Sequence, residues 1–254
     1  MKLARNGLKA ALAEGRLQRG LWLALGSPAV AELAGQAGFD WCLVDGEHAP
    51  YDITAIRDQL LALAGTPAAA VVRVPAAEPW LIKQVLDIGA QTLLVPMVDS
   101  AEAARAVVAA CRYPPAGIRG VGAALGRASG YNAIADYTTG ADREICVIVQ
   151  AETRASLADL DAIAATEGVD AVFIGPADLS ADMGHPGDPG APEVTAAIED
   201  AIGRIRAAGK AVGIIDLRPG MAEHYRDLGV GFVGVGADVT ALGAALRGLA
   251  AGQG

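Results

Sequence analysis

Eight short runs of apolar residues recur along the chain, and longer helix-like stretches separate them. The runs are nearly continuous in apolar character rather than alternating, which is typical of parallel strands covered on both faces. They lie at residues 20–25, 41–44, 70–74, 92–96, 145–150, 171–174, 211–215 and 232–235. Between them, segments such as 101–111 and 193–208 place apolar residues at helical spacing. The pattern therefore predicts alternating strands and helices.

Glycines mark several of the expected helix ends. Gly38, Gly89, Gly209 and Gly229 each follow a helix-like stretch and precede the next apolar run, where a left-handed cap suits glycine. Eight such units in 254 residues match a (β/α)8 barrel, and a doubly wound open sheet is the alternative. No interdomain linker stands out, so we expect one barrel domain over residues 1–254. The connections at 112–143 and 178–193 are long enough to be functional or mobile loops.

The composition narrows the range of partners. With 20 Lys and Arg against 29 Asp and Glu, the net charge of −9 argues against nucleic acid, which needs a basic surface. No stretch reaches the ~18 apolar residues of a membrane-spanning helix. Residues 1–16 carry charges instead of the apolar core of a secretion signal. Cys42, Cys111 and Cys146 are odd in number and widely spaced, which argues against a disulfide scaffold. We therefore expect a cytoplasmic protein without a membrane partner.

Ionisable side chains follow the predicted strands. In a barrel the carboxyl ends of the strands form one rim, where catalytic groups lie. The polar residues at that rim are Asp45, Glu47, His48, Arg73, Gln150, Glu152, Asp178, Asp216 and Asp238. Crowded carboxylates repel one another unless a cation compensates, and a hard divalent metal ion is the simplest compensator.

Each candidate also has a plainer interpretation. Glu152 and Asp178 are equally consistent with helix caps or solvated loop carboxylates. His48 could serve as a cap, but its place beside two acids at a strand end favours a general base. Arg73 would point into the barrel mouth, and because a buried arginine needs an anionic partner, we favour substrate anchoring. For Arg218 we favour a solvated side chain.

Two glycine patterns do not indicate an organic cofactor. Residues 229–234 match G-x-G-x-x-G but run into a strand, whereas the dinucleotide fingerprint follows a strand and opens a helix. Residues 117–122 resemble a phosphate loop but lack its Gly-Lys-Ser/Thr ending. We therefore expect no organic cofactor.

The strand-end residues stand in an order that resembles the HpcH/HpaI family of metal-dependent class II pyruvate aldolases. The resemblance covers nearly the whole chain, and its markers are residues 20–23, 39–50, 71–73, 92–97, 112–120 and 173–180. The last two segments are long and specific. The resemblance implies a modified (β/α)8 barrel that assembles as a trimer or hexamer, with the last helix exchanged between partner barrels.

The same resemblance implies a binding site. It makes Glu152 and Asp178 the carboxylate ligands of one divalent ion, which would be Mg²⁺, Mn²⁺ or Co²⁺. Gln150 and the backbone amides of Ala177 and Asp178 would contact the substrate. Trp22 would lie beside it, near the loops that set specificity.

Four residues are implied in the catalysis. Arg73 matches the arginine that stabilises charge on the 2-oxo oxygen, and His48 matches the general base. Asp87 matches the acid that raises the basicity of that histidine. Asp45 would orient metal-bound water or the same histidine.

The implied reaction is reversible aldol cleavage of a 4-hydroxy-2-oxoacid, such as 4-hydroxy-2-oxoheptanedioate, to pyruvate or hydroxypyruvate and an aldehyde through a metal-stabilised enolate. Such a step would belong to the catabolism of aromatic compounds or sugar acids. Lys2, Lys9, Lys83 and Lys210 are not placed for Schiff-base chemistry, which favours the metal-dependent route. The alternatives are an acyl-coenzyme A carbon–carbon lyase of the citrate lyase β type and a barrel that only binds a metabolite.

Overall fold

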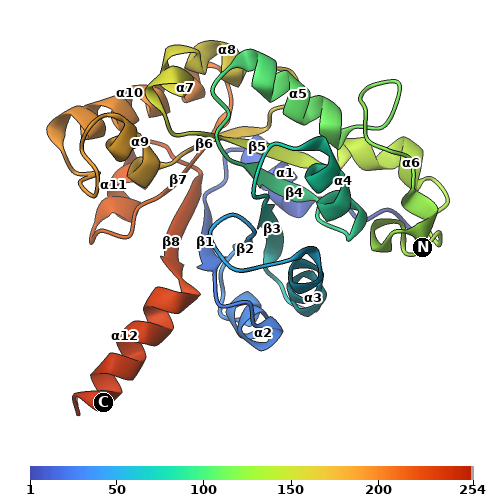
Figure 1. Cartoon of the computed structure of the whole chain (residues 1–254), viewed down its shortest axis with the longest axis horizontal. Helices are drawn as coiled ribbons and strands as arrows, with labels where there is room; N and C mark the ends of the chain where they lie inside the picture. Colours follow the sequence, from blue (N-terminus) through green and yellow to red (C-terminus); the bar gives the residue numbers. More distant parts are fainter. Residues whose placement is uncertain (253–254) are drawn as a thin grey trace.

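The predicted strands close into a parallel barrel (Figure 1). The computed structural model describes residues 1–252. The strands are β1 (Gln18–Leu23), β2 (Trp41–Asp45), β3 (Ala69–Arg73), β4 (Thr92–Val95), β5 (Cys146–Ala151), β6 (Ala171–Ile174), β7 (Ala211–Ile215) and β8 (Phe232–Ala237). Each strand pairs with its neighbour in chain order, and β8 pairs with β1. This closure confirms the (β/α)8 barrel and excludes the open sheet.

Helices follow the strands and cover much of the outside of the barrel. They are α1 (Gly7–Ala13), α2 (Pro28–Gln36), α3 (Ile53–Leu63), α4 (Pro79–Asp87), α5 (Ala101–Cys111), α6 (Tyr137–Gly140), α7 (Arg154–Ala158), α8 (Leu160–Ala165), α9 (Pro176–Asp182), α10 (Pro192–Ala207), α11 (Met221–Asp227) and α12 (Asp238–Ala250). The glycines at 38, 89, 209 and 229 have φ values of 96°, 106°, 73° and 89°. The predicted left-handed caps are therefore confirmed.

Aromatic side chains fill the inside of the barrel. The ring of Trp41 stacks on Phe232 with centroids 4.1 Å apart, and Trp22 lies edge-on to Trp41 at 5.6 Å. Gly20 leaves the space that the Trp41 indole occupies, because a Cβ at that position would overlap the ring. With this interior packed, a substrate can reach only the ends of the barrel.

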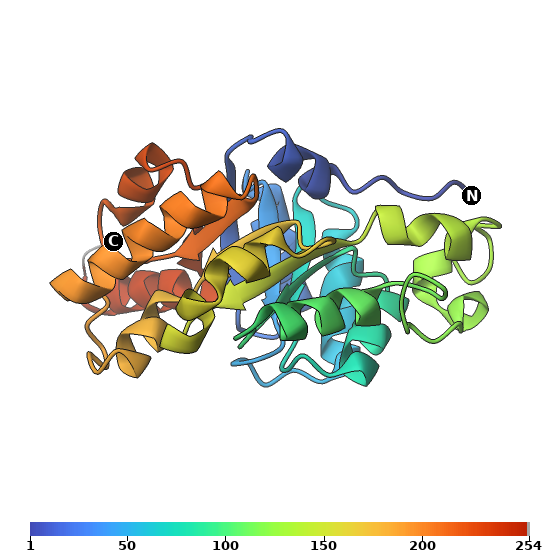
Figure 2. The ribbon, with the colours of Figure 1, turned by 90° about the horizontal axis from the view of Figure 1, so that it is seen from above.

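The connection at 112–143 folds on a small core of its own. Its buried members are Tyr113, Ala123, Ile134, Tyr137 and Ala141. The first residues of the chain lie against this connection (Figure 2), and the amino group of Met1 donates to the carbonyl of Ala133 at 2.8 Å. This connection is therefore held in a defined conformation by burial and hydrogen bonds.

The last helix, α12, projects from the barrel instead of packing along it (Figure 1). Its apolar side chains Leu242, Leu246 and Leu249 are 46%, 55% and 66% exposed. Asp238 fixes the start of the helix, because its carboxylate accepts the backbone N–H groups of Ala24 and Leu25 at 2.8 and 3.1 Å. Within residues 1–252, no helix is long and apolar enough to cross a membrane.

Candidate active site

Arg73 is clamped by two acids at the carboxyl ends of β2 and β3. The strand register places it directly beside Asp45. Its Nε and Nη2 donate to the two oxygens of Asp45 at 2.8 and 2.6 Å. Its Nη1 forms an ion pair with Glu47 Oε2 at 2.9 Å. The structure thus gives Arg73 the anionic surroundings that a buried arginine needs.

Asp45 also shapes the turn that follows β2. Its Oδ1 accepts the backbone N–H groups of Glu47 at 3.1 Å and His48 at 3.3 Å. Burial alone would raise the pKa of Asp45, but the hydrogen bonds and positive charge of Arg73 outweigh it and lower the pKa. Asp45 is therefore held as a carboxylate that contacts the backbone of His48 rather than its ring.

His48 lies at the open mouth of the barrel. Its side chain is 64% exposed, and its Nε2 is 3.8 Å from Glu47 Oε2. That distance makes an ionic contact but is too long for a hydrogen bond. Burial raises the pKa of Glu47 despite the opposing charges of Arg73 and His48. Sequence reasoning noticed Glu47 only as an acid beside His48, and its contact with Arg73 was not predicted.

Glu152 is the most confined carboxyl group at this rim. Its Oε1 accepts the backbone N–H of Met97 at 2.7 Å, and its Oε2 accepts Nε2 of Gln150 at 2.5 Å. Met97 has a left-handed backbone with φ of 55°, which aims this N–H at the carboxylate. Gly175 lies against the same group, since a Cβ there would be 2.6 Å from Oε2. The role of Gly175 was missed, because in the sequence it reads only as the start of a helix.

The charges around Glu152 suit a divalent cation. Burial raises its pKa, and the negative charges of Asp178 and Glu47 raise it further. Asp178 lies exposed in the first turn of α9. Within residues 1–252 no three His, Cys, Asp or Glu side chains form a complete metal site. Two carboxylates that leave positions for water and substrate oxygens fit a hard ion such as Mg²⁺ or Mn²⁺.

Three further residues were predicted to contact the substrate. Gln150 is buried, and its Oε1 has no hydrogen-bond partner among the described residues. Trp22 lies inside the barrel with its ring 5.8 Å from the Arg73 guanidinium, so it forms part of the floor. Ala177 is exposed in the first turn of α9, where backbone N–H groups have no partner within the helix.

Asp87 stands apart from these residues. It is the last residue of α4, which runs back from the carboxyl end of β3 to the amino end of β4. It accepts Nη2 of Arg119 at 2.7 Å, and that buried guanidinium lies 4.4 Å from the Tyr113 ring. The structure therefore does not bring Asp87 to the His48 of the same chain. Arg218, expected to be solvated, instead pairs with Asp216 at 2.5 Å.

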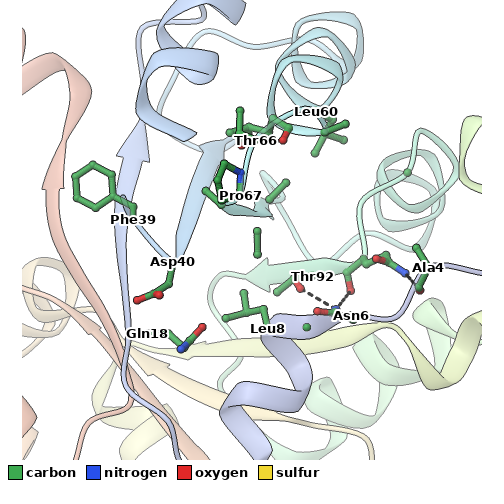
Figure 3. Close-up of a pocket in the computed structure, with 18 of the residues that line it drawn as sticks. Ala4, Asn6, Leu8, Gln18, Phe39, Asp40, Leu60, Thr66, Pro67 and Thr92 are labelled. Carbon is green, nitrogen blue, oxygen red and sulfur yellow. Dashed lines mark hydrogen bonds between the residues drawn. The ribbon is translucent and has the colours of Figure 1, made fainter. Parts of the chain in front are cut away.

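A groove of 810 Å³ opens at the opposite rim (Figure 3). Phe39, Asp40, Pro67 and Thr92 are among its lining residues. Asn6 also lines it, and its side chain donates to Thr92 Oγ1 at 3.0 Å. None of the predicted site residues lines this groove, so it is separate from the candidate active site.

A parallel barrel with a clamped arginine and confined carboxylates at its catalytic rim is suited to an enzyme that stabilises negative charge on its substrate. The model of the family described as HpcH/HpaI aldolase/citrate lyase matches residues 18–245. The chain belongs to this family and is an aldolase, a carbon–carbon lyase. The family depends on a divalent metal ion, which agrees with the donor set at Glu152 and Asp178.

Named relatives cover nearly the whole chain. A hydroxypyruvate/pyruvate aldolase of Pseudomonas aeruginosa is 58% identical over 250 residues, which are 98% of this chain and 93% of the relative. A 4-hydroxy-2-oxo-heptane-1,7-dioate aldolase of Klebsiella pneumoniae is 56% identical, covering 97% and 93%. The crystal structure of a family member from Burkholderia cenocepacia superposes with a TM-score of 0.93 at 42% identity, covering 95% and 96%.

Proposed function

We propose that this protein cleaves a 4-hydroxy-2-oxoacid reversibly into pyruvate or hydroxypyruvate and an aldehyde. The observation that carries the proposal is the buried Arg73 guanidinium, held at the same rim as the confined carboxylate of Glu152. The names of the relatives, which include hydroxypyruvate, pyruvate and 4-hydroxy-2-oxo-heptane-1,7-dioate, support this substrate class.

Glu152 and Asp178 would hold the divalent ion, which when bound supplies positive charge beside the 2-oxo oxygen of the substrate. Arg73 presents a fixed guanidinium where negative charge grows on that oxygen as the C3–C4 bond breaks. His48, exposed at the mouth, takes the proton from the C4 hydroxyl and returns it to C3. Gln150 and the backbone amides of Ala177 and Asp178 would orient the substrate.

We further propose that the active form is a homo-oligomer, either a trimer or a hexamer. The exposed apolar side chains of α12 support an exchange of this helix onto a second barrel. The position of Asp87 supports the same assembly. Because Asp87 lies away from the His48 of its own chain, the role that the family resemblance gives to Asp87 would need the Asp87 of a second chain. The single domain and the cytoplasmic location remain predictions from the sequence.

The substrate class is tested by incubating the protein with pyruvate or hydroxypyruvate, a panel of aldehydes and Mn²⁺. Mass spectrometry should detect the 4-hydroxy-2-oxoacid product, and EDTA should abolish it. Cleavage of coenzyme A thioesters without any product from free oxoacids would instead favour the citrate lyase β type of reaction.

A further inference from the structure

The backbone N–H that donates to Glu152 belongs to a residue in an uncommon conformation. Met97 has φ of 55°, a left-handed value that a residue with a Cβ keeps only where its surroundings hold it there. Met97 is also 54% exposed, so the packing of its own side chain does not hold it. Contacts made by the neighbouring residues must therefore maintain this backbone.

Those neighbours are bonded to the segment that follows β5. The residue after Met97 donates its backbone N–H to the carbonyl of Gln150 at 3.2 Å. The next residue, Asp99, accepts a hydrogen bond from the Thr153 hydroxyl at 2.5 Å. Thr153 is the donor because a carboxylate has no proton to give. These two bonds lie on either side of the contact between Met97 and Glu152, and they hold its two segments together.

Thr153 also caps α7, but this plainer role does not need Asp99. Its Oγ1 accepts the backbone N–H of Ser156 at 3.0 Å, and Ser156 Oγ accepts the backbone N–H of Thr153 at 3.0 Å. This reciprocal pair forms a capping box within one segment. The bond to Asp99 instead spans 54 residues of the chain and joins the segments after β4 and β5. Its effect is therefore on how these two segments lie relative to each other.

We propose that Asp99 is a positioning residue for the carboxylate of Glu152. By holding Thr153 it fixes the chain directly after Glu152. The same bond fixes the chain after Met97 and keeps the Met97 N–H aimed at Oε1 of Glu152. The proposal rests on the proposed function, because it takes Glu152 as a ligand of the divalent ion.

The test is a titration of metal-free protein with Mn²⁺, with free Mn²⁺ followed by electron paramagnetic resonance. Asp99→Ala should weaken Mn²⁺ binding about 10- to 100-fold, as the loss of a group that orients a metal ligand does. Asp99→Asn should bind Mn²⁺ nearly as tightly as the wild type, because its amide oxygen still accepts the Thr153 hydroxyl. Unchanged affinity in Asp99→Ala, or equal weakening in Asp99→Asn, would overturn the positioning role.

Thr153 provides a second test of the same bond. Thr153→Val removes the hydroxyl and should weaken Mn²⁺ binding, whereas Thr153→Ser keeps the hydroxyl and should not. Since Asp99→Ala and Thr153→Val break one shared bond, the double variant should lose no more affinity than the weaker-binding single variant. Losses that multiply in the double variant would show that the two residues act separately, which contradicts the proposal.

Asp159→Ala is the matched control, because Asp159 joins the same two segments at a point further along the chain. Its Oδ2 accepts the backbone N–H of Ala101, the first residue of α5, at 2.7 Å. This variant should have a lower melting temperature but bind Mn²⁺ like the wild type. Equal weakening of Mn²⁺ binding in Asp159→Ala and Asp99→Ala would show a general loosening and overturn the proposal.

The wild type distinguishes this role from the proposed function. A wild type that binds Mn²⁺ but forms no product with any aldehyde would overturn the proposed function alone. A wild type that binds no Mn²⁺ would overturn both.

Discussion

Gly175→Ala should damage the metal site without removing any ligand. In the structure an added Cβ would lie 2.6 Å from Oε2 of Glu152 and 2.9 Å from its Cβ. Ordinary van der Waals contact begins near 3.4 Å. Either the backbone at this position or the carboxylate must therefore shift by about 0.8 Å.

The size of that shift sets the expected effect. Metal–ligand distances are maintained within ~0.2 Å, so a carboxylate displaced several times as far no longer fits the ion. The hydrogen bonds from Met97 and Gln150 oppose any compensating movement of Glu152. Disturbing the groups that orient a ligand costs about 10- to 100-fold in metal affinity. Overpacking should also cost about 1–3 kcal/mol of folding stability.

The assay is a titration of metal-free protein with Mn²⁺, with free Mn²⁺ followed by electron paramagnetic resonance. Gly203→Ala is the matched control, because a Cβ at Gly203 in α10 meets no atom within 4 Å. It should bind Mn²⁺ like the wild type. A Gly175→Ala protein that folds and binds Mn²⁺ within twofold of the wild type would show that Glu152 does not hold the ion.

Three further changes have defined outcomes. Arg73→Lys should lower kcat about 100- to 1000-fold in steady-state assays, because one ammonium group cannot replace the planar guanidinium that Asp45 holds through two hydrogen bonds. Turnover at the wild-type rate would contradict the proposed role of Arg73 in stabilising charge on the substrate. Burial raises the pKa of Glu152, so protons should compete with Mn²⁺ at a higher pH than they would at an ordinary carboxylate. The Mn²⁺ affinity measured by calorimetry should therefore weaken as the pH falls toward that pKa. An affinity that stays constant as the pH falls would contradict this. Leu246→Glu should reduce the mass measured by light scattering if α12 packs on a second barrel, and an unchanged mass would remove that contact.

The fold could be predicted because its signals are local. A parallel strand covered on both faces must be apolar throughout, and Gly38 or Gly89 is needed where the backbone turns left-handed. The sequence also placed Asp45 and Arg73 at the ends of predicted strands, but their pairing was not predicted and is seen only in the strand register.

Other features could not be predicted, because they depend on contacts between residues far apart in the sequence, which the hydrophobic pattern does not reveal. The left-handed backbone of Met97 and the space at Gly175 matter only because the Glu152 side chain meets both. The apolar pattern of α12 predicts burial, but a single chain does not specify the surface that buries it. The family resemblance gives Asp87 a role beside the histidine, yet α4 carries it to the far end of the barrel in its own chain.

The central claim is that this protein activates the methyl group of pyruvate with its own base and a divalent ion. Proton NMR in D₂O tests it directly, because the pyruvate methyl signal disappears as its protons exchange with deuterium. The account predicts exchange with Mg²⁺ that stops with EDTA, and that is lost in the His48→Ala and Glu152→Gln proteins. Exchange that continues in His48→Ala at the wild-type rate, or that does not depend on the metal ion, would contradict it.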